Sequence, residues 1–141
     1  MSQALRWTAE EQKQHRADWC AALESGDYQQ AHMGLRDDRG FCCLGVACDV
    51  FFRKTGQGEW RRKRLAYVTP SNEIEGSVLP RVVRHYFGLR TEVGDYGTQS
   101  LTGLNDTEKW EFADIAEIIR SAPPGLIEGR ATREAGVKVG I

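Results

Sequence analysis

The sequence lacks a hydrophobic run long enough to cross a membrane, which takes about 18 residues or more. Its densest apolar stretch, residues 41–52, is shorter than that and is interrupted by a glycine and an aspartate. Residues 1–11 are mostly polar and lead into an acidic helix start, so they do not read as a secretory signal. We therefore expect a cytoplasmic protein with no membrane partner.

The sequence also lacks an excess of charge, because 19 Lys and Arg residues face 20 Asp and Glu residues and leave a net charge of -1. This balance excludes a globally basic nucleic-acid-binding protein but leaves room for a local basic patch. A hydrophobic content of 40% and a length of 141 residues suit one globular domain with a true core. We expect a single domain over residues 1–141, with residues 125–141 as a loosely held C-terminal tail.

Ligand pairs of the kind that hold structural zinc are missing as well. Such sites place two ligands two to four residues apart, whereas Cys42, Cys43 and Cys48 are adjacent or five to six residues apart. Cysteines of cytoplasmic proteins stay reduced, and we expect buried thiols, no metal and no cofactor. The alternative is a nucleophilic Cys42 or Cys43 near a helix start, with His32 as its base.

The sequence does contain clear signals for where helices start and stop. Thr8 and Glu11 form a capping box, which predicts a helix over residues 9–25 that stops at Gly26. The polar first half of that helix, residues 10–16, is expected at the surface. Apolar residues at helical spacing over 43–55 predict a second helix that is apolar nearly all round and therefore the most buried.

The second half of the chain predicts two more helices. Pro80 suits the first turn of a helix that stops at Gly88. The last helix is expected to open at residues 105–108, with Asn105 or Thr107 as its cap, and to end at the two prolines that follow Ala122.

The strand signals are shorter. The turn at residues 37–40 predicts a hairpin that pairs 33–36 with 40–43. Residues 60–68 are expected to be extended, 91–100 to form a surface loop and 101–104 to form a short strand. The fold class is therefore α+β, with three to four helices packed on a small antiparallel sheet and a central buried helix after the Cys-Cys segment.

Two features could recognise a ligand. The first is the basic 53–64 patch, which consists of Arg53, Lys54 and residues 61–64 and is flanked by Trp60 and Tyr67. Basic and aromatic side chains together can hold phosphates and stack bases, although Lys and Arg on an exposed edge strand also prevent unwanted sheet pairing.

The second feature is a set of polar side chains at element ends, where ligand groups often gather. Asn105 and Asp106 could equally be plain helix caps. We expect no catalytic residues; the candidate ligand-binding residues are Tyr28, Gln30, Trp60, Arg61, Arg62, Arg64, Asn105 and Asp106.

Three segments between Trp19 and Ile119 carry a resemblance. They read W-x-x-A-L-x-S-G-x-Y-x-Q from Trp19, F-C-C-L-G-V-x-C-D from Phe41, and L-x-x-L-N-D from Leu101 followed by F-x-x-I-A-x-I-I from Phe112. Together they are similar to a family of small uncharacterised proteins of bacteriophages and prophages. The resemblance implies a genetic context inside a bacterial host cell, and no reaction.

From these features we expect a small phage-type accessory protein that binds a ligand or a host partner without catalysis. As a host-takeover or counter-defence factor it would sequester a nucleotide-like ligand or a host protein. The alternatives are a nucleic-acid-binding module that uses the basic 53–64 patch and a cysteine-dependent enzyme. A homodimer is left open because Trp110 lies on an otherwise polar turn.

Overall fold

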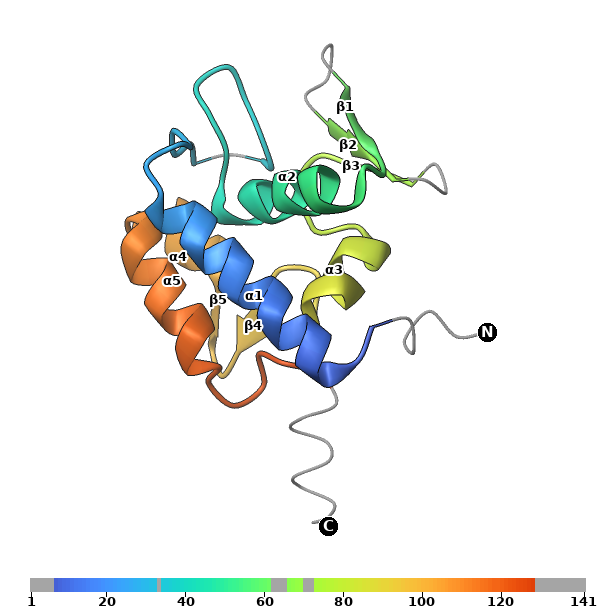
Figure 1. The fold of residues 1–141 in the computed structure, drawn as a ribbon. Coiled ribbons are helices and arrows are strands. Elements are labelled where there is room, and N and C mark those ends of the chain that lie inside the picture. The colour runs from blue at the N-terminus through green and yellow to red at the C-terminus, as the bar shows by residue number, and fades with distance from the viewer. Residues whose placement is uncertain (1–6, 33, 62–65, 70–72, 129–141) are drawn as a thin grey trace.

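The computed structural model describes residues 7–32, 34–61, 66–69 and 73–128. These residues form five helices and two small antiparallel sheets (Figure 1), which confirms the predicted α+β class with one helix more than expected. The helices are α1 (Ala9–Glu24), α2 (Cys43–Thr55), α3 (Arg81–Phe87), α4 (Leu101–Asp106) and α5 (Phe112–Ser121). Within this described part, no helix is both long and apolar enough to span a membrane.

The strands are short and lie at two places. β1 (Glu59–Arg61), β2 (Ala66–Val68) and β3 (Ile74–Glu75) form an antiparallel sheet in that order, with Trp60 opposite Tyr67 in the register of β1 and β2. β4 (Asp95–Tyr96) pairs with β5 (Gln99–Ser100) in a separate hairpin. The segment expected to be one extended stretch, 60–68, thus contributes to two strands, and the loop expected over 91–100 contains a hairpin.

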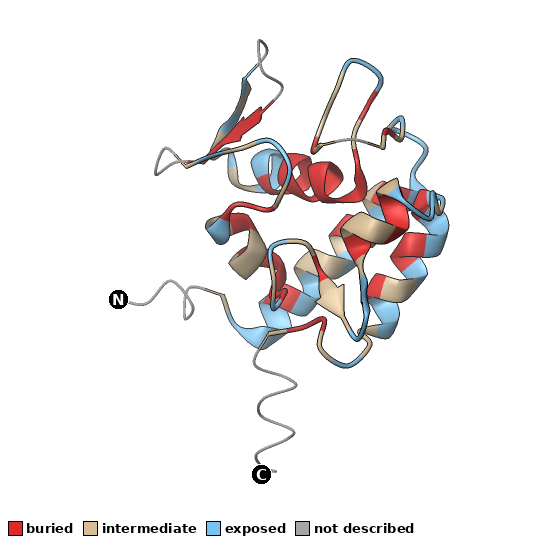
Figure 2. Ribbon diagram, turned by 180° about the vertical axis from the view of Figure 1, so that it is seen from behind, coloured by how far each residue is buried: buried red, intermediate tan, exposed pale blue. Residues whose placement is uncertain are grey.

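Helix α2 is the centre of the fold, as the sequence predicts. Every residue from Cys43 to Phe51 is buried, and Figure 2 shows the helix red along most of its length. Helices α1, α3 and α4 all pack against it. It ends at Gly56, whose φ of 71° is the left-handed conformation that glycine adopts without strain.

The start of α2 is held by the chain segment that precedes it. The backbone N–H of Cys42 donates to the carbonyl oxygen of Leu35 at 3.1 Å. This carbonyl lies so close to Gly45 that a side-chain carbon on residue 45 would overlap it. Glycine is therefore required at position 45, although its backbone is helical. The predicted turn at 37–40 forms, but the hairpin around it is reduced to a bridge between Arg36 and Phe41, and residue 33 lies outside the described residues.

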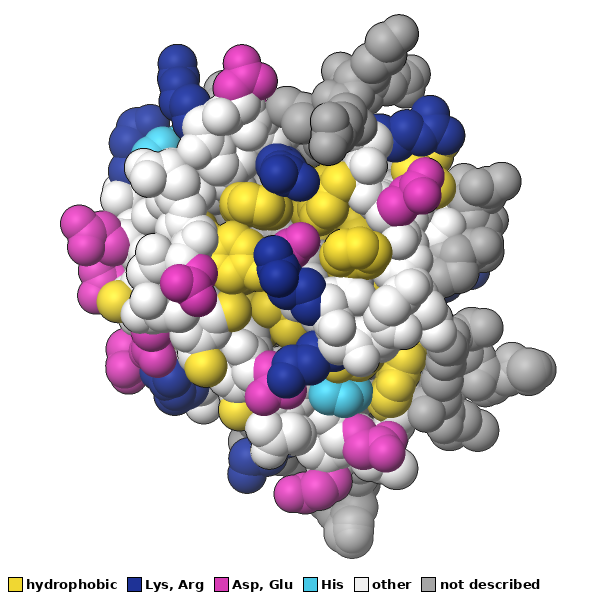
Figure 3. Space-filling view, turned by 45° about the horizontal axis from the view of Figure 1, so that its top comes forward, with side chains coloured by type: hydrophobic (Ala, Val, Ile, Leu, Met, Phe, Trp, Pro, Cys, Tyr) yellow, Lys and Arg dark blue, Asp and Glu magenta, His cyan; other side chains and the backbone are white. Residues whose placement is uncertain are grey.

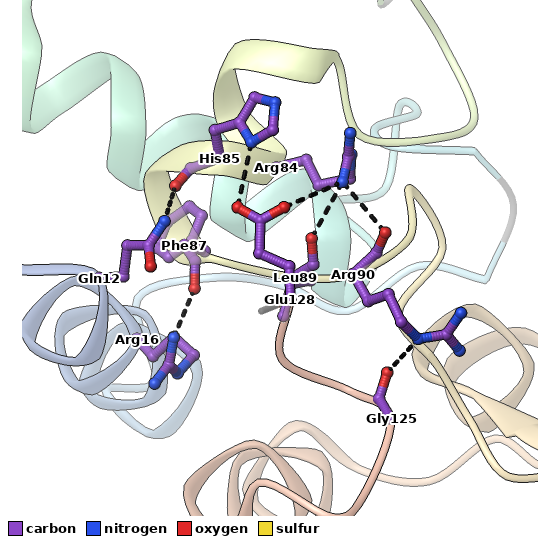
Figure 4. A network of polar contacts seen from close by, with 9 residues as sticks. All are labelled: Gln12, Arg16, Arg84, His85, Phe87, Leu89, Arg90, Gly125 and Glu128. Atoms are coloured by element: carbon purple, nitrogen blue, oxygen red, sulfur yellow. Dashed lines mark hydrogen bonds and ion pairs between the residues drawn. The ribbon is translucent and has the colours of Figure 1, made fainter. Parts of the chain in front are cut away.

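The polar first half of α1 is exposed at Glu10, Glu11, Lys13 and Gln14, as expected of a surface segment, but it does not simply face solvent. Three carbonyl oxygens at the C-terminal end of α3, where a helix leaves its last carbonyls unpaired, accept hydrogen bonds from it. Gln12 Nε2, His15 Nδ1 and Arg16 Nη1 each approach one of them at 2.7 Å. Figure 4 shows Gln12 and Arg16 pointing at the carbonyls of His85 and Phe87. Gln12 is buried as a result.

The expected strand over 101–104 and the expected helix start at 105–108 are both wrong. Residues 101–104 belong to helix α4, which begins after Ser100 because the Ser100 hydroxyl accepts the Gly103 N–H at 2.9 Å. The last helix, α5, starts at Phe112, so neither Asn105 nor Thr107 caps it. Its apolar stripe is buried and consists of Phe112, Ile115, Ala116 and Ile119.

The end of the described chain packs onto α3. Leu126 and Ile127 are buried, and Ile127 bridges to Leu89. The Glu128 carboxylate lies 3.1 Å from His85 Nδ1 and 3.4 Å from Arg84 Nη1 (Figure 4). Residues 125–128, expected as the start of a loosely held tail, are thus engaged with the fold, and 129–141 lie outside the described residues.

Candidate functional site

A cleft of about 870 Å³ opens between the end of α1, the loop before α2, helix α2 itself and strand β1. Figure 3 looks onto this face, where hydrophobic side chains gather around an acidic one and basic side chains lie beside them. The volume is within the range of small-molecule sites. The lining residues are Asp18, Ala21, Ala22, Ser25, Asp27, Tyr28, Arg36, Phe41, Asp49, Val50, Phe52, Arg53, Lys54 and Trp60.

A buried carboxylate organises this cleft. Asp49 is 5% exposed and comes from the apolar helix α2. Its Oδ2 accepts from the Tyr28 hydroxyl at 2.6 Å and from Arg53 Nε at 2.7 Å, and its Oδ1 accepts from Trp60 Nε1 at 3.0 Å. Asp49 therefore fixes side chains from three separate segments: the loop after α1, the next turn of α2, and β1.

These contacts decide the protonation of the group. Burial raises the pKa of Asp49, but hydrogen bonds from Arg53, Tyr28 and Trp60 outweigh burial and hold the pKa below its usual value. Burial, followed by the hydrogen bond to Asp49, raises the pKa of Tyr28 to about 12. At neutral pH the carboxylate is therefore charged, and the phenol stays a hydrogen-bond donor.

Aromatic rings form one continuous wall of the cleft. The Phe41 ring meets the Tyr28 ring edge-on at 5.1 Å between centroids and the Trp60 ring at 5.7 Å. The guanidinium carbon of Arg36 lies 4.7 Å from the centroid of Phe41 and 5.3 Å from that of Trp60. A cation at such distances is attracted by the ring faces, so Arg36 is held over the aromatic wall.

Some charged side chains of the cleft lining are in ion pairs with one another, and others are not. Lys54 Nζ lies 4.0 Å from Asp18 Oδ2, and Arg53 pairs with Asp49. Arg36 makes no hydrogen bond or ion pair with any described residue, and the Asp27 side chain is exposed to solvent. The cleft therefore presents an oriented guanidinium group without a carboxylate partner among the described residues.

A second hollow, about 660 Å³ in volume, lies between α1 and α5. Two of its three basic side chains are already engaged within the fold: Arg16 with the Phe87 carbonyl, and Arg120 with Glu24 in a two-bond ion pair. The Cys20 thiol in its wall is buried. We therefore take the cleft around Asp49 as the candidate site.

The structure separates the eight predicted ligand-binding residues into different places. Tyr28 and Trp60 line the cleft. Arg61 follows Trp60 in β1 and is exposed outside the lining. Arg62 and Arg64 lie outside the described residues. Gln30, Asn105 and Asp106 are also absent from the lining and meet one another at the N-terminal end of α2.

Asn105 is a structural brace at that place. It is 0% exposed. Its Oδ1 accepts from the Cys43 N–H at 3.1 Å and from Gln30 Nε2 at 2.9 Å, while its Nδ2 donates to the Ala31 carbonyl at 2.9 Å and to Asp106 Oδ1 at 2.7 Å. Asn105 therefore lies inside α4 and caps the start of α2 from across the fold.

All four cysteines are free and buried, which confirms their predicted burial. Burial raises the pKa of Cys20 to about 11 and that of Cys42 to about 12, and it raises the pKa of Cys43 and Cys48 well above the usual thiol value. Among the described residues, no three His, Cys, Asp or Glu side chains come together in a way that could hold a metal ion.

Sequence reasoning missed three side chains of the cleft: Arg36, Phe41 and Asp49. A signal for Asp49 was present, because it is the only charged residue in the apolar run 41–52 and has Arg53 one turn later. No comparable signal exists for Arg36, whose role depends on the Phe41 ring across the turn and on the Trp60 ring from β1.

Comparison with known proteins gives one match. No curated protein and no solved structure matches the chain. Residues 11–122 match a family described as "Domain of unknown function (DUF8296)", and this span takes in every residue that lines the cleft. Because the match covers most of the chain, the protein belongs to the DUF8296 family.

Proposed function

We propose that this chain is a binding protein whose cleft holds a small, ring-containing anion of the nucleotide kind. The observation that carries the proposal is the meeting of an aromatic wall with a guanidinium group that has no acidic partner among the described residues. Aromatic faces stack nucleobases regardless of base identity, and arginine is suited to phosphate oxygens.

Binding fits the cleft better than catalysis does. The buried carboxylate of Asp49 already accepts from three side chains, so it is poorly placed to take a proton from a substrate. The thiols are buried, and their raised pKa values work against a nucleophilic role. A cysteine-dependent enzyme is therefore the least favoured of the candidate functions.

The biological setting belongs to the same proposal. A phage or prophage accessory protein with such a cleft would sequester a nucleotide-like ligand of its bacterial host, as a host-takeover or counter-defence factor. A host protein, or a second copy of the chain, is the alternative occupant of this face. Native mass spectrometry of the protein purified from its host separates these cases by the mass of what stays bound.

The proposal is tested by thermal unfolding with a panel of ribonucleoside mono- and triphosphates, because a ligand that binds only the folded state raises Tm. We expect at least one of them to raise the Tm of the wild type and of Arg39→Glu, and to leave that of Arg36→Glu unchanged. Arg39 is the matched control, since it is exposed on the same loop and does not line the cleft. No rise in the wild type, or an equal rise in Arg36→Glu, would contradict the proposal.

A nucleic-acid strand is the second candidate ligand, favoured by the exposed Arg61 beside Trp60 on β1. A strand that crosses the cleft would contact Arg53, Lys54 and Arg61. Its affinity would fall by decades as salt rises, because many phosphate contacts release many counterions. A mononucleotide makes few such contacts, so its affinity should depend only weakly on salt.

A further inference from the structure

We infer that the cleft recognises a terminal phosphate group, which accepts hydrogen bonds from the guanidinium groups of both Arg36 and Arg53. This inference rests on the proposed function and narrows it from anions with a ring to phosphate monoesters. The argument depends on how each arginine is held, and on which of its N–H groups remain open.

Arg53 is fixed mainly through its Nε atom. Its Nε donates to Asp49 Oδ2 at 2.7 Å, while its side chain is 71% exposed. The guanidinium also interacts with the Tyr28 hydroxyl. Its remaining terminal N–H groups are exposed and can donate to a ligand in the cleft. Since Asp49 is itself held by Tyr28 and Trp60, the orientation of this fork is set before any ligand arrives.

Arg36 is held in a different way, by ring faces instead of an acid. Its guanidinium carbon lies 4.7 Å from the Phe41 centroid and 5.3 Å from the Trp60 centroid. Ring faces attract the charge without using the N–H groups at the guanidinium edge. Its donors therefore have no acceptor among the described residues, and both arginines line the same cleft.

The number of guanidinium N–H donors available to a ligand favours a terminal phosphate over an internal phosphodiester. A terminal phosphate carries about −1.5 to −2 charges near neutral pH and three free oxygens, enough to accept from two planar forks. A phosphodiester inside a strand has two free oxygens and a single charge. The cleft also contains carboxylates: the charge of Asp49 is compensated by Arg53, Asp18 faces Lys54, and Asp27 is exposed to solvent.

The test compares three probes for each of the four bases by isothermal titration calorimetry: the nucleoside, its 5′-monophosphate, and a dinucleoside joined by an internal phosphodiester. We expect the monophosphate to bind about tenfold or more tightly than the other two, because one charge-assisted hydrogen bond alone is worth that much. Equal affinity for the dinucleoside overturns the inference while leaving the proposed function standing. Equal affinity for the uncharged nucleoside contradicts the proposed function as well. Absence of binding by all three probes overturns both.

Variants locate the effect. Arg36→Lys and Arg53→Lys keep the charge but lose the planar fork, so each should weaken the affinity for the monophosphate about tenfold and leave the affinity for the nucleoside unchanged. Arg36→Lys should keep the Tm of the wild type, whereas Arg53→Lys also loses the Nε bond to Asp49 and should lower the Tm. Arg39→Lys is the control and should bind like the wild type. Unchanged monophosphate affinity in both cleft variants would overturn the assignment of these two residues.

Discussion

Replacing Asn105 by Ala should be among the most damaging changes in the chain. The amide makes four hydrogen bonds at 0% exposure, two of which satisfy the backbone groups Cys43 N–H and Ala31 C=O. Each buried backbone group left without a partner costs about 1–3 kcal/mol. Two of them, with the gap left by the amide, give a loss of about 3–5 kcal/mol in the free energy of unfolding.

The measurement is urea unfolding of the variant and the wild type. If the dependence of the unfolding free energy on urea has the same slope in both, a shift of the midpoint reports a change in stability alone. Thr102→Val on the same helix is the matched control, because the Thr102 hydroxyl oxygen is buried with no hydrogen-bond partner among the described residues. Removing that hydroxyl should change stability by less than about 0.5 kcal/mol, or increase it. A loss below about 1 kcal/mol for Asn105→Ala, or an equal loss in the control, would refute the reasoning.

Three further predictions follow from the same contacts. Gly45→Ala should lower the urea midpoint strongly because the methyl overlaps a backbone carbonyl, whereas Gly76→Ala, with open space around it, should be nearly neutral. Native protein at pH 8 should not react with a thiol-specific disulfide reagent, since burial raises the pKa of Cys20 to about 11 and of Cys42 to about 12. All thiols should react after unfolding, and rapid reaction of the native protein would contradict the prediction. Because the folded-state pKa of Asp49 is lowered, the Asp49 carboxylate stabilises the fold above the unfolded pKa of 3.8, and this stabilisation is lost as pH falls through the folded pKa. Asp49→Asn should therefore flatten the acid limb of a plot of stability against pH. An unchanged acid limb would contradict this prediction.

The sequence predicts those elements whose ends are marked locally. The capping box at Thr8, the left-handed stops at Gly56 and Gly88, and the proline before α3 all act within one turn of the helix that they delimit. Helix α4 escaped prediction because its short apolar run also fits a strand. Its start does carry a local signal, the Ser100 cap, and Asn105 joins the helix to α2 at the other side of the fold.

In the candidate site, too, features that depend on local sequence could be predicted, and contacts between distant segments could not. Tyr28 and Trp60 could be named from their position at element ends and beside basic residues, but their common partner Asp49 joins them only in three dimensions. The polar face of α1 likewise gives no sign of its role from sequence, since Gln12 and Arg16 look solvated until the carbonyls of α3 are placed against them.

The claim that the cleft around Asp49 is the binding site can be tested most directly through the indole N–H signals of the four tryptophans. In ¹H–¹⁵N spectra, addition of a ribonucleoside 5′-monophosphate should shift the Trp60 signal, whose N–H donates to Asp49 in the cleft. The Trp19 signal, whose N–H is buried against the Cys43 carbonyl, should stay in place. A Trp60 signal that does not move at saturating ligand, or a shift confined to Trp7 or Trp110, would contradict the account.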